Sequence, residues 1–238
     1  MKYIHNQAQY DIRCEWGENG VKQLAPISDV VIIVDVMSFS TCVSIAVSQG
    51  ATVYPFLLDR VRAAEYAATI GAVSAQARAG GLYSLSPPTM LKLQPGMKIV
   101  LPSGNGARLT LLSGGTTCLA GSLRNAKAVA HRAMNLGTEI AIIPAGERWL
   151  SDDSLRPAME DWIGAGAIIS HFTGKKSPEA ISAEEAFKSV SGNLSKTLTE
   201  CSSGQELVFS GYLDDILSIA DLDADDVAPV LIDGYYSR

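Results

Sequence analysis

A single acid interrupts an apolar run near the start of this chain, in the segment VVIIVDVMSFSTCVSIAVSQG at residues 30–50. Six of the seven residues from Val30 to Val36 are apolar, and the seventh is Asp35. The apolar run is typical of a buried strand, and the hydroxyl-rich residues after it are typical of a turn into a helix. A buried charge is costly unless it is paired, hydrogen-bonded or bound to a metal. The partner of Asp35 therefore bears directly on what this chain does.

Apolar strand-like runs alternate with amphipathic helical stretches through most of the 238 residues. This alternation predicts an α/β fold with a layered mixed or mainly parallel sheet and helices on both faces. The length suits a single α/β domain over residues 1–238, with two closely packed subdomains as the alternative. Strands are expected at 30–36, 51–56, 97–101, 116–120, 139–144 and 227–232. Helices are expected at 40–49, 59–70, 106–113, 124–136, 157–173, 178–190 and 212–220.

Helix ends carry recognisable residues. Ser40 and Asp59 are predicted N-caps, and Pro157 suits the first turn of its helix. Residues 175–212 are polar and without a strand pattern, which predicts a helical appendage or lid. Five glycines are predicted to close helices in the left-handed conformation: Gly50, Gly71, Gly114, Gly137 and Gly174.

Composition excludes several classes of protein. The net charge of −6 and the absence of a basic stripe argue against a nucleic-acid or anionic-membrane partner. The four cysteines are dispersed, which argues against a zinc site or a disulfide framework. Cys42 and Cys118 lie in apolar segments and are predicted to be core residues. The amino-terminal stretch MKYIHNQAQYDIRCEW has no apolar signal core, and no run reaches transmembrane length. We therefore expect a cytoplasmic protein, and a small anionic substrate held by a local cluster of Arg is compatible with this charge.

Polar side chains follow four of the expected strands. If those strands are parallel, the residues share one edge of the sheet, where ligands of open α/β sheets bind. Helix N-termini and Arg side chains bind phosphate, and carboxylates bind Mg²⁺, so the mixture predicts a phosphorylated substrate with magnesium. The residues are Asp35, Ser38, Ser40 and Thr41; Ser103, Asn105 and Arg108; Ser122, Arg124 and Asn125; and Glu147, Arg148, Asp152, Asp153, Arg156, Glu160 and Asp161.

Each element also has a purely structural interpretation. Asp35 is equally consistent with a helix cap or a core ion pair with Arg, and the SGNGAR segment with an ordinary turn. Glu160 and Asp161 are adjacent on a helix, so one is expected to point inward and the other to be solvated. Arg124 and Asn125 open a helix, where capping is the alternative role. The three histidines fit no metal-ligand spacing.

Six ordered segments resemble the 2-phosphosulfolactate phosphatase family. VDVMSFSTCVSIAVSQGATVYP resembles the family pattern VDVLRASTTIVTALxxGAxxVxP, and SLSPPTM stands at its G-N-S-P stretch. LPSGNGARLTLL corresponds to its T-T-N-G-T-R segment, and GSLRNAKAVA to G-S-x-x-N-x-x-A-V-A. AIIPAG and EDWIGAGAII resemble V-x-x-AG and E-D-x-x-x-AG-x-x-I. The order and spacing of all six segments make this a specific resemblance that runs nearly from end to end.

The resemblance implies a Mg²⁺-dependent phosphatase of coenzyme M biosynthesis that acts on a small phosphorylated acid, and a homo-oligomer, most simply a dimer. At matching positions it implies catalytic roles for Asp35, Asn105, Glu160 and Asp161, with Asp35, Glu160 and Asp161 linked to the metal. Further expected substrate-binding residues are Ser38, Ser40, Arg78, Ser103, Arg124, Asn125, Glu147 and Arg148.

The chain departs from the family pattern at three positions. Ser38 stands where the family has Arg, Ala77 where it has an acid beside the retained Arg78, and Leu85 where it has Asn. The stretch AGERWLSDDSLRPAMED is also longer and more charged than usual, and Glu147, Arg148 and Arg156 offer replacement charges. Two alternatives to a phosphatase follow: a protein that binds a small anion without turnover, and a related enzyme with a changed substrate or reaction.

Overall fold

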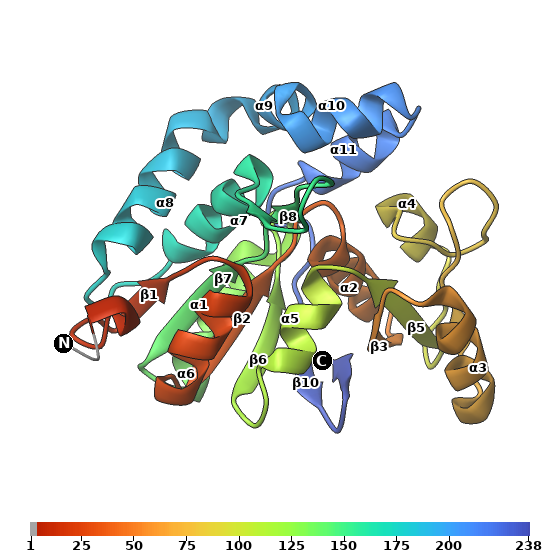
Figure 1. Cartoon of the computed structure of the whole chain (residues 1–238), viewed down its shortest axis with the longest axis horizontal. Helices are drawn as coiled ribbons and strands as arrows, with labels where there is room; N and C mark the ends of the chain where they lie inside the picture. Colours follow the sequence, from red (N-terminus) through yellow and green to blue (C-terminus); the bar gives the residue numbers. More distant parts are fainter. Residues whose placement is uncertain (1–3) are drawn as a thin grey trace.

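The computed structural model describes residues 4–238, so the first three residues of the amino-terminal stretch discussed above lie outside it. Within that range, nine strands form one sheet in the order β1-β7-β2-β6-β10-β11-β3-β5-β4, and β8 and β9 form a separate two-stranded ribbon (Figure 1). The strands are β1 (Ile12–Cys14), β2 (Val30–Val34), β3 (Thr52–Leu57), β4 (Val73–Ser74), β5 (Lys98–Ser103), β6 (Thr117–Gly121), β7 (Ile140–Pro144), β8 (Glu147–Arg148), β9 (Leu155–Arg156), β10 (Val230–Ile232) and β11 (Tyr235–Ser237).

Helices cover both faces of this sheet, as the alternating pattern predicted (Figure 1). They are α1 (Gly17–Leu24), α2 (Phe39–Ser48), α3 (Arg60–Ile70), α4 (Pro87–Met90), α5 (Gly106–Leu112), α6 (Ala126–Leu136), α7 (Met159–Ile169), α8 (Pro178–Val190), α9 (Leu194–Glu200), α10 (Ser202–Phe209) and α11 (Leu213–Ile219). Short 3₁₀ turns are η1 (Ile4–Asn6), η2 (Ala25–Ile27), η3 (Leu123–Asn125) and η4 (Ser191–Asn193).

Strand β2 lies at the centre of the main parallel group, paired in parallel with both β6 and β7. Its side chains alternate between faces because successive residues of a strand point in opposite directions. Val30, Ile32 and Val34 pack in the core built with α6, α7 and α8, whereas Val31 and Ile33 pack in the core built with α1, α2 and α5. Burial on both faces explains why the strand sequence is apolar throughout.

An antiparallel hairpin joins two parallel groups of strands, so the sheet is mixed. Strands β10 and β11 pair with each other, and β10 also pairs with β6 through Val230 and Leu119. β11 pairs with β3 through Tyr236 and Val53. Strands β3, β5 and β4 are parallel to one another but are separated from β6 by these antiparallel pairings. The four strand ends expected on one parallel edge therefore come from two groups.

Several sequence-based boundaries need correction. The strand expected at 227–232 covers only β10, and β1, β4, β8, β9, β11, α1 and α4 were not predicted. Asp59 caps α3 as expected, but Ser40 lies inside α2 and Pro157 precedes α7. Gly50, Gly71 and Gly114 have positive φ angles. Gly137 has the extended φ of 176°, and Gly174 is not among the positive-φ glycines.

The segment expected to be a helical appendage is helical. Helix α8 packs against α7, and α9, α10 and α11 follow it across the top of the view in Figure 1. Gly166 of α7 permits the close contact with α8, because a Cβ there would lie 2.0 Å from the Ala183 carbonyl oxygen. Across residues 4–238, no helix is long and apolar enough to span a membrane.

Candidate active site

Asp35 lies directly after β2 and is only 5% exposed. Its Oδ1 accepts a hydrogen bond from the Phe39 backbone N–H at 3.1 Å, and its Oδ2 accepts one from the Gly106 N–H at 2.7 Å. The carboxylate therefore joins the first turns of α2 and α5, although their strands belong to different parallel groups. Helix N-termini favour a negative charge at this position.

Gly106 of the SGNGAR segment is required for this contact. A Cβ at that position would lie 2.4 Å from Phe39 Cδ1 and 2.7 Å from Asp35 Oδ2, closer than real Cβ atoms approach. Only glycine lets the α5 backbone reach the carboxylate. This close approach explains the glycine in the sequence better than an ordinary turn does.

Glu160 and Asp161 begin α7 and are both buried, at 1% and 3% exposure. The expectation that one of them is solvated is therefore wrong. Asp161 accepts the backbone N–H groups of Val36 at 2.7 Å and Gly146 at 2.8 Å, which ties the loops after β2 and β7 together. Glu160 is held less firmly: Cys201 Sγ lies 3.6 Å from Oε2, and Oε1 is buried with no hydrogen-bond partner among the described residues.

Glu147 of β8 completes the group of acids. Asn105 donates from Nδ2 to its carboxylate at 2.9 Å, so the loop before α5 also holds this side chain. Burial, followed by the charges of Asp35 and Glu160, raises the pKa of Glu147 to about 7. Burial also raises the pKa of Asp35 to about 6, although its two backbone hydrogen bonds oppose the change. These carboxylates thus repel one another in a poorly solvated site.

Arg78 is the positively charged side chain that acts on Asp35. It donates from Nη2 to Ser38 Oγ at 2.8 Å and to the Leu85 carbonyl at 2.6 Å. Its Nε lies 3.1 Å from Asp215 of α11, so the guanidinium is paired to the helical appendage and not to Asp35. Ser38, which stands where the family pattern has Arg, is therefore in contact with a guanidinium from another segment.

A cavity of about 190 Å³ opens between this group and the appendage. Arg78 and Glu147 form one wall, and Ser203, Glu206 and Tyr212, from α10 and the residue preceding α11, line the other side. The appendage thus covers the acids, as a lid would, and it brings Cys201 against Glu160.

Two of the predicted serines support the loops. The Ser40 hydroxyl accepts the Asp35 N–H at 3.1 Å and donates to the Ile33 carbonyl at 3.0 Å, which fixes the end of β2. The Ser103 hydroxyl accepts the Asn105 N–H at 3.3 Å. Both serines therefore shape the loops around Asp35.

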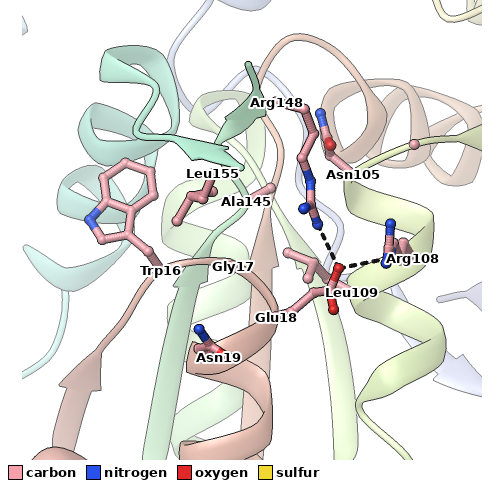
Figure 2. Close-up of a pocket in the computed structure, with 11 residues that line it drawn as sticks. Trp16, Gly17, Glu18, Asn19, Asn105, Arg108, Leu109, Ala145, Arg148 and Leu155 are labelled. Carbon is pink, nitrogen blue, oxygen red and sulfur yellow. Dashed lines mark hydrogen bonds and ion pairs between the residues drawn. The ribbon is translucent and has the colours of Figure 1, made fainter. Parts of the chain in front are cut away.

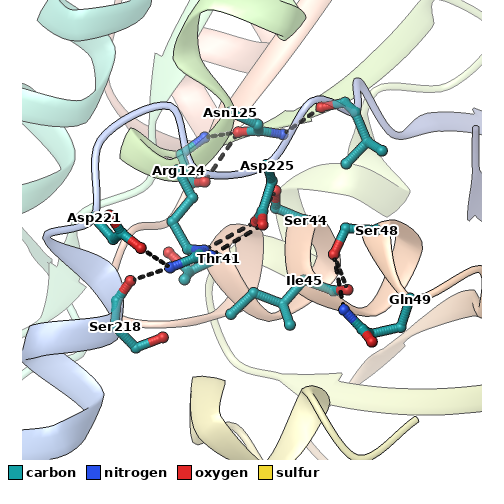
Figure 3. A network of polar contacts seen from close by, with 12 residues as sticks. Thr41, Ser44, Ile45, Ser48, Gln49, Arg124, Asn125, Ser218, Asp221 and Asp225 are labelled. Atoms are coloured by element: carbon teal, nitrogen blue, oxygen red, sulfur yellow. Dashed lines mark hydrogen bonds and ion pairs between the residues drawn. The ribbon is translucent and has the colours of Figure 1, made fainter. Parts of the chain in front are cut away.

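Arg124 and Asn125 lie in a different network, shown in Figure 3. Arg124 forms a bidentate ion pair with Asp225, with Nε 2.9 Å from Oδ2 and Nη2 3.0 Å from Oδ1. It also donates to the Ser218 carbonyl. Asn125 accepts from the Ser122 backbone N–H and hydroxyl and donates to backbone carbonyls. These contacts hold the segment after α11 against the body of the protein, so the structure does not bring either residue to the acids.

Arg148 points away from the acids into a second cavity, where it contacts Glu18 (Figure 2). Arg156 donates to Ser203 and lies over the Trp149 ring. Cys42 and Cys118 are core residues, as predicted.

The donor chemistry of the acid group fits a hard divalent cation. Buried carboxylates that are not directly paired with a basic side chain, one of them with an unpartnered oxygen, suit Mg²⁺, which commonly binds one or two carboxylates, waters and substrate phosphate. Among residues 4–238, however, no three His, Cys, Asp or Glu side chains form a ready-made metal cluster. A cation here therefore depends on water and substrate oxygens for the rest of its ligands.

Sequence reasoning missed four residues that touch this site or its surroundings: Glu18, Cys201, Asp215 and Asp225. Asp215 contacts Arg78 across 137 residues of sequence, and Cys201 contacts Glu160 across 41. No local motif marks such contacts. An acidic residue on an otherwise apolar helix face, such as Asp215 in LDDILSI, is the available signal.

Comparison with known proteins agrees with the six-segment resemblance. Residues 19–234 match the family described as 2-phosphosulpholactate phosphatase. A "Probable 2-phosphosulfolactate phosphatase" from Carboxydothermus hydrogenoformans is 29% identical over 212 residues, 84% of each chain. The "2-phosphosulfolactate phosphatase" of Methanothermobacter thermautotrophicus is 29% identical over 192 residues, 79% of this chain and 80% of that protein. The chain therefore belongs to the 2-phosphosulfolactate phosphatase family, a family of phosphoric monoester hydrolases.

Proposed function

We propose that this protein is a magnesium-dependent phosphatase that hydrolyses the phosphomonoester of a small acid. The names of two relatives, which describe 2-phosphosulfolactate phosphatases, support the phosphatase activity. The observation that carries the proposal is the group of buried acids Asp35 and Glu160 with the half-buried Glu147 beside them, in which Glu160 Oε1 has no hydrogen-bond partner among the described residues. Burying carboxylates without a directly paired basic side chain is unfavourable, so the site favours a cation. A structural role would instead call for a basic partner.

We assign Asp35 and Glu160 as the residues that would hold Mg²⁺, with Asp161 orienting the loops around them. When bound, Mg²⁺ would neutralise charge on the phosphoryl group. Asp35 and Asp161 each accept two backbone N–H groups. We assign Asp161 the orienting role because its two hydrogen bonds join the loops after β2 and β7, and Asp35 the metal because it lies beside Glu160, whose charge acts on it. Burial is the main cause of the raised pKa values of Asp35 and Glu147, and the charges of the neighbouring carboxylates add to it, so a divalent cation would favour the charged forms.

The remaining side chains suit binding and proton transfer. Arg78, with the Ser38 hydroxyl, offers donors for phosphate oxygens, and Asn105 positions Glu147. We assign Glu147 as the general acid–base group, since a pKa of about 7 suits a group that gains and loses a proton near neutral pH. In the reaction, water forms the new P–O bond, the ester P–O bond breaks, and the leaving oxygen takes up a proton.

A role in coenzyme M biosynthesis, a homodimer and a cytoplasmic location are further proposals. The first two rest on the family resemblance, and the third on the dispersed, free cysteines. Size measurement in solution tests the dimer directly.

The test is phosphate release from a panel of phosphorylated small acids, measured with Mg²⁺ and with a chelator. We expect release that depends on Mg²⁺ and is lost in Asp35→Asn, while Asp221→Asn, a surface change, behaves like the unmodified protein. No release from any substrate, together with tight binding of phosphate in calorimetry, would favour the anion-binding alternative. Equal rates for Asp35→Asn and the unmodified protein would exclude this site.

A further inference from the structure

A second cavity, of about 260 Å³, is lined by Asn105, whose side-chain amide also donates to Glu147. Figure 2 shows the residues around this cavity. The start of α1 and the start of α5 form its sides, and Arg148 enters from β8. Trp16 and Leu155 provide an apolar wall (Figure 2). Asn105 borders this cavity and also contacts the acid group, so the two spaces share one side chain.

Two guanidinium groups converge in this cavity on one carboxylate oxygen. Arg108 Nε lies 2.8 Å and Arg148 Nη2 lies 2.5 Å from Glu18 Oε1, and Lys22 lies 3.4 Å from Oε2. Asp153, 77% exposed, lies 3.9 Å from Arg148 and screens it weakly. Three cationic side chains therefore face two carboxylates, in a chain whose net charge is −6.

Glu18 occupies the position that an acid group from outside would take. Burial alone would raise its pKa, but the hydrogen bond from Arg148 and the charge of Arg108 outweigh burial and lower it. Both guanidinium groups remain partly exposed, at 44% for Arg108 and 30% for Arg148, so a ligand can reach them. Arginine pairs of this kind bind carboxylate and sulfonate oxygens through charge-assisted hydrogen bonds.

We propose that this cavity is a subsite for the carboxylate or sulfonate group of the substrate, bound by Arg108 and Arg148 after it displaces Glu18. This inference rests on the proposed function, since it supplies the second anchor for a substrate whose phosphate lies at the acid group. It makes Arg148 a residue that determines specificity between phosphomonoesters that carry this further acid group and those that do not.

The first test measures binding without catalysis. Calorimetry with sulfoacetate and with malonate, which carry no phosphate, is run on the unmodified protein, Arg148→Gln, Glu18→Gln and the exposed control Arg132→Gln. We expect Arg148→Gln to weaken binding about tenfold, because one charge-assisted contact is lost. Glu18→Gln should strengthen binding because the internal competitor loses its charge, and Arg132→Gln should leave it unchanged. Thermal unfolding verifies that each variant is folded.

Equal affinities in Arg148→Gln and Arg132→Gln would overturn the inference. So would inorganic phosphate binding that depends on Arg148 more strongly than sulfoacetate binding does, since the cavity would then be a phosphate site. Preference for sulfoacetate over malonate, or the reverse, identifies the acid group.

The second test compares kcat/KM for phosphorylated acids with that for alkyl phosphates, which carry no anionic group besides the phosphate. Arg148→Gln should lower this ratio about tenfold. A ratio equal to that of the unmodified protein overturns the inference while leaving the phosphatase intact. Absence of phosphate release together with Arg148-dependent sulfoacetate binding instead rejects the proposed function and retains the anion site.

Discussion

Backbone N–H groups, and not basic side chains, hold the acids at this site. Asp35 and Asp161 each accept two backbone N–H donors, so their carboxylates are fixed in place without a direct ion pair to a basic side chain. An ion pair would fix them equally well but would also cancel the charge that a cation needs. The arrangement thus combines rigidity with a negative potential, which is what a preorganised metal and phosphate site requires.

The Gly106 contact gives a sharp prediction for a single residue. Gly106→Ala places a Cβ against Phe39 and Asp35, so we expect a loss of about 1–3 kcal/mol in the free energy of unfolding and reduced phosphate release. Gly104→Ala, two residues earlier, meets only Leu58 at 3.6 Å and should change stability little. Urea unfolding of both variants measures the difference. Equal stability of the two would show that the α5 backbone does not need to approach the carboxylate.

Single residues also show the limit of sequence reasoning. Asp35 was recognisable because a charge stood in an apolar strand, where burial demands a partner. Arg124 and Asn125 satisfied the same strand-end argument, yet the structure uses them elsewhere. The partners of Arg124 lie about a hundred residues away, in a segment with no motif, and only the fold brings Asp225 to it. Asn125 instead bonds mainly to its neighbours Ser122 and Ala120, which is the capping role that was the alternative.

At the scale of elements, the Arg124–Asp225 contact fastens the segment after α11 (Figure 3). Asp225 also accepts a hydrogen bond from Ser44 of α2 at 2.8 Å, so one carboxylate joins three segments. Asp221 contacts the same arginine from a position that is 65% exposed. The chain thus offers a buried and an exposed partner of one guanidinium.

This pair allows a matched comparison. Asp225→Asn leaves the buried Arg124 without its charge partner, and we expect it to lower the free energy of unfolding by about 3–5 kcal/mol. Asp221→Asn should cost less than about 1 kcal/mol, because exposed ion pairs contribute little. Unfolding curves in guanidinium chloride distinguish the two variants. Similar midpoints for both variants would mean that the buried pair does not stabilise the fold.

Long apolar elements were predictable and short ones were not. The sequence pattern placed the ends of β2, β7 and α8 within a few residues of their observed positions. These elements are long enough for their runs or periods of apolar residues to be visible in the sequence. Strands β1, β8 and β9 have only two or three residues each, too few for a period to be visible. The β8–β9 ribbon nevertheless carries Glu147 and Arg148, so part of the site belongs to the least predictable class of element.

For the whole molecule, the acid group should make stability depend on pH. The folded-state pKa values of Asp35, about 6, and Glu147, about 7, lie above their ordinary values of 3.8 and 4.5. The folded protein therefore binds these protons more tightly than the unfolded chain does. The resulting stabilisation is complete below about pH 4 and is lost as the pH rises to about 7.

We expect the melting temperature in metal-free buffer to fall between about pH 5 and about pH 7.5, and Mg²⁺ to reverse the fall. Glu147→Gln removes one of the titrating acids. Over this pH range, the free energy of unfolding of this variant should therefore fall by about 2 kcal/mol less than that of the unmodified protein. Differential scanning calorimetry at several pH values gives both slopes. Parallel pH profiles for Glu147→Gln and the unmodified protein would contradict the raised pKa of Glu147.

The most direct measurement of the central claim is Mg²⁺-dependent phosphate release by Glu160→Gln, which keeps the size of the side chain and removes its charge. If the unpartnered carboxylate of Glu160 serves a cation at the reacting phosphate, the rate should fall at least about a hundredfold at saturating substrate, and added Mg²⁺ should not restore it. A folded Glu160→Gln protein with the rate and Mg²⁺ dependence of the unmodified protein would contradict the account.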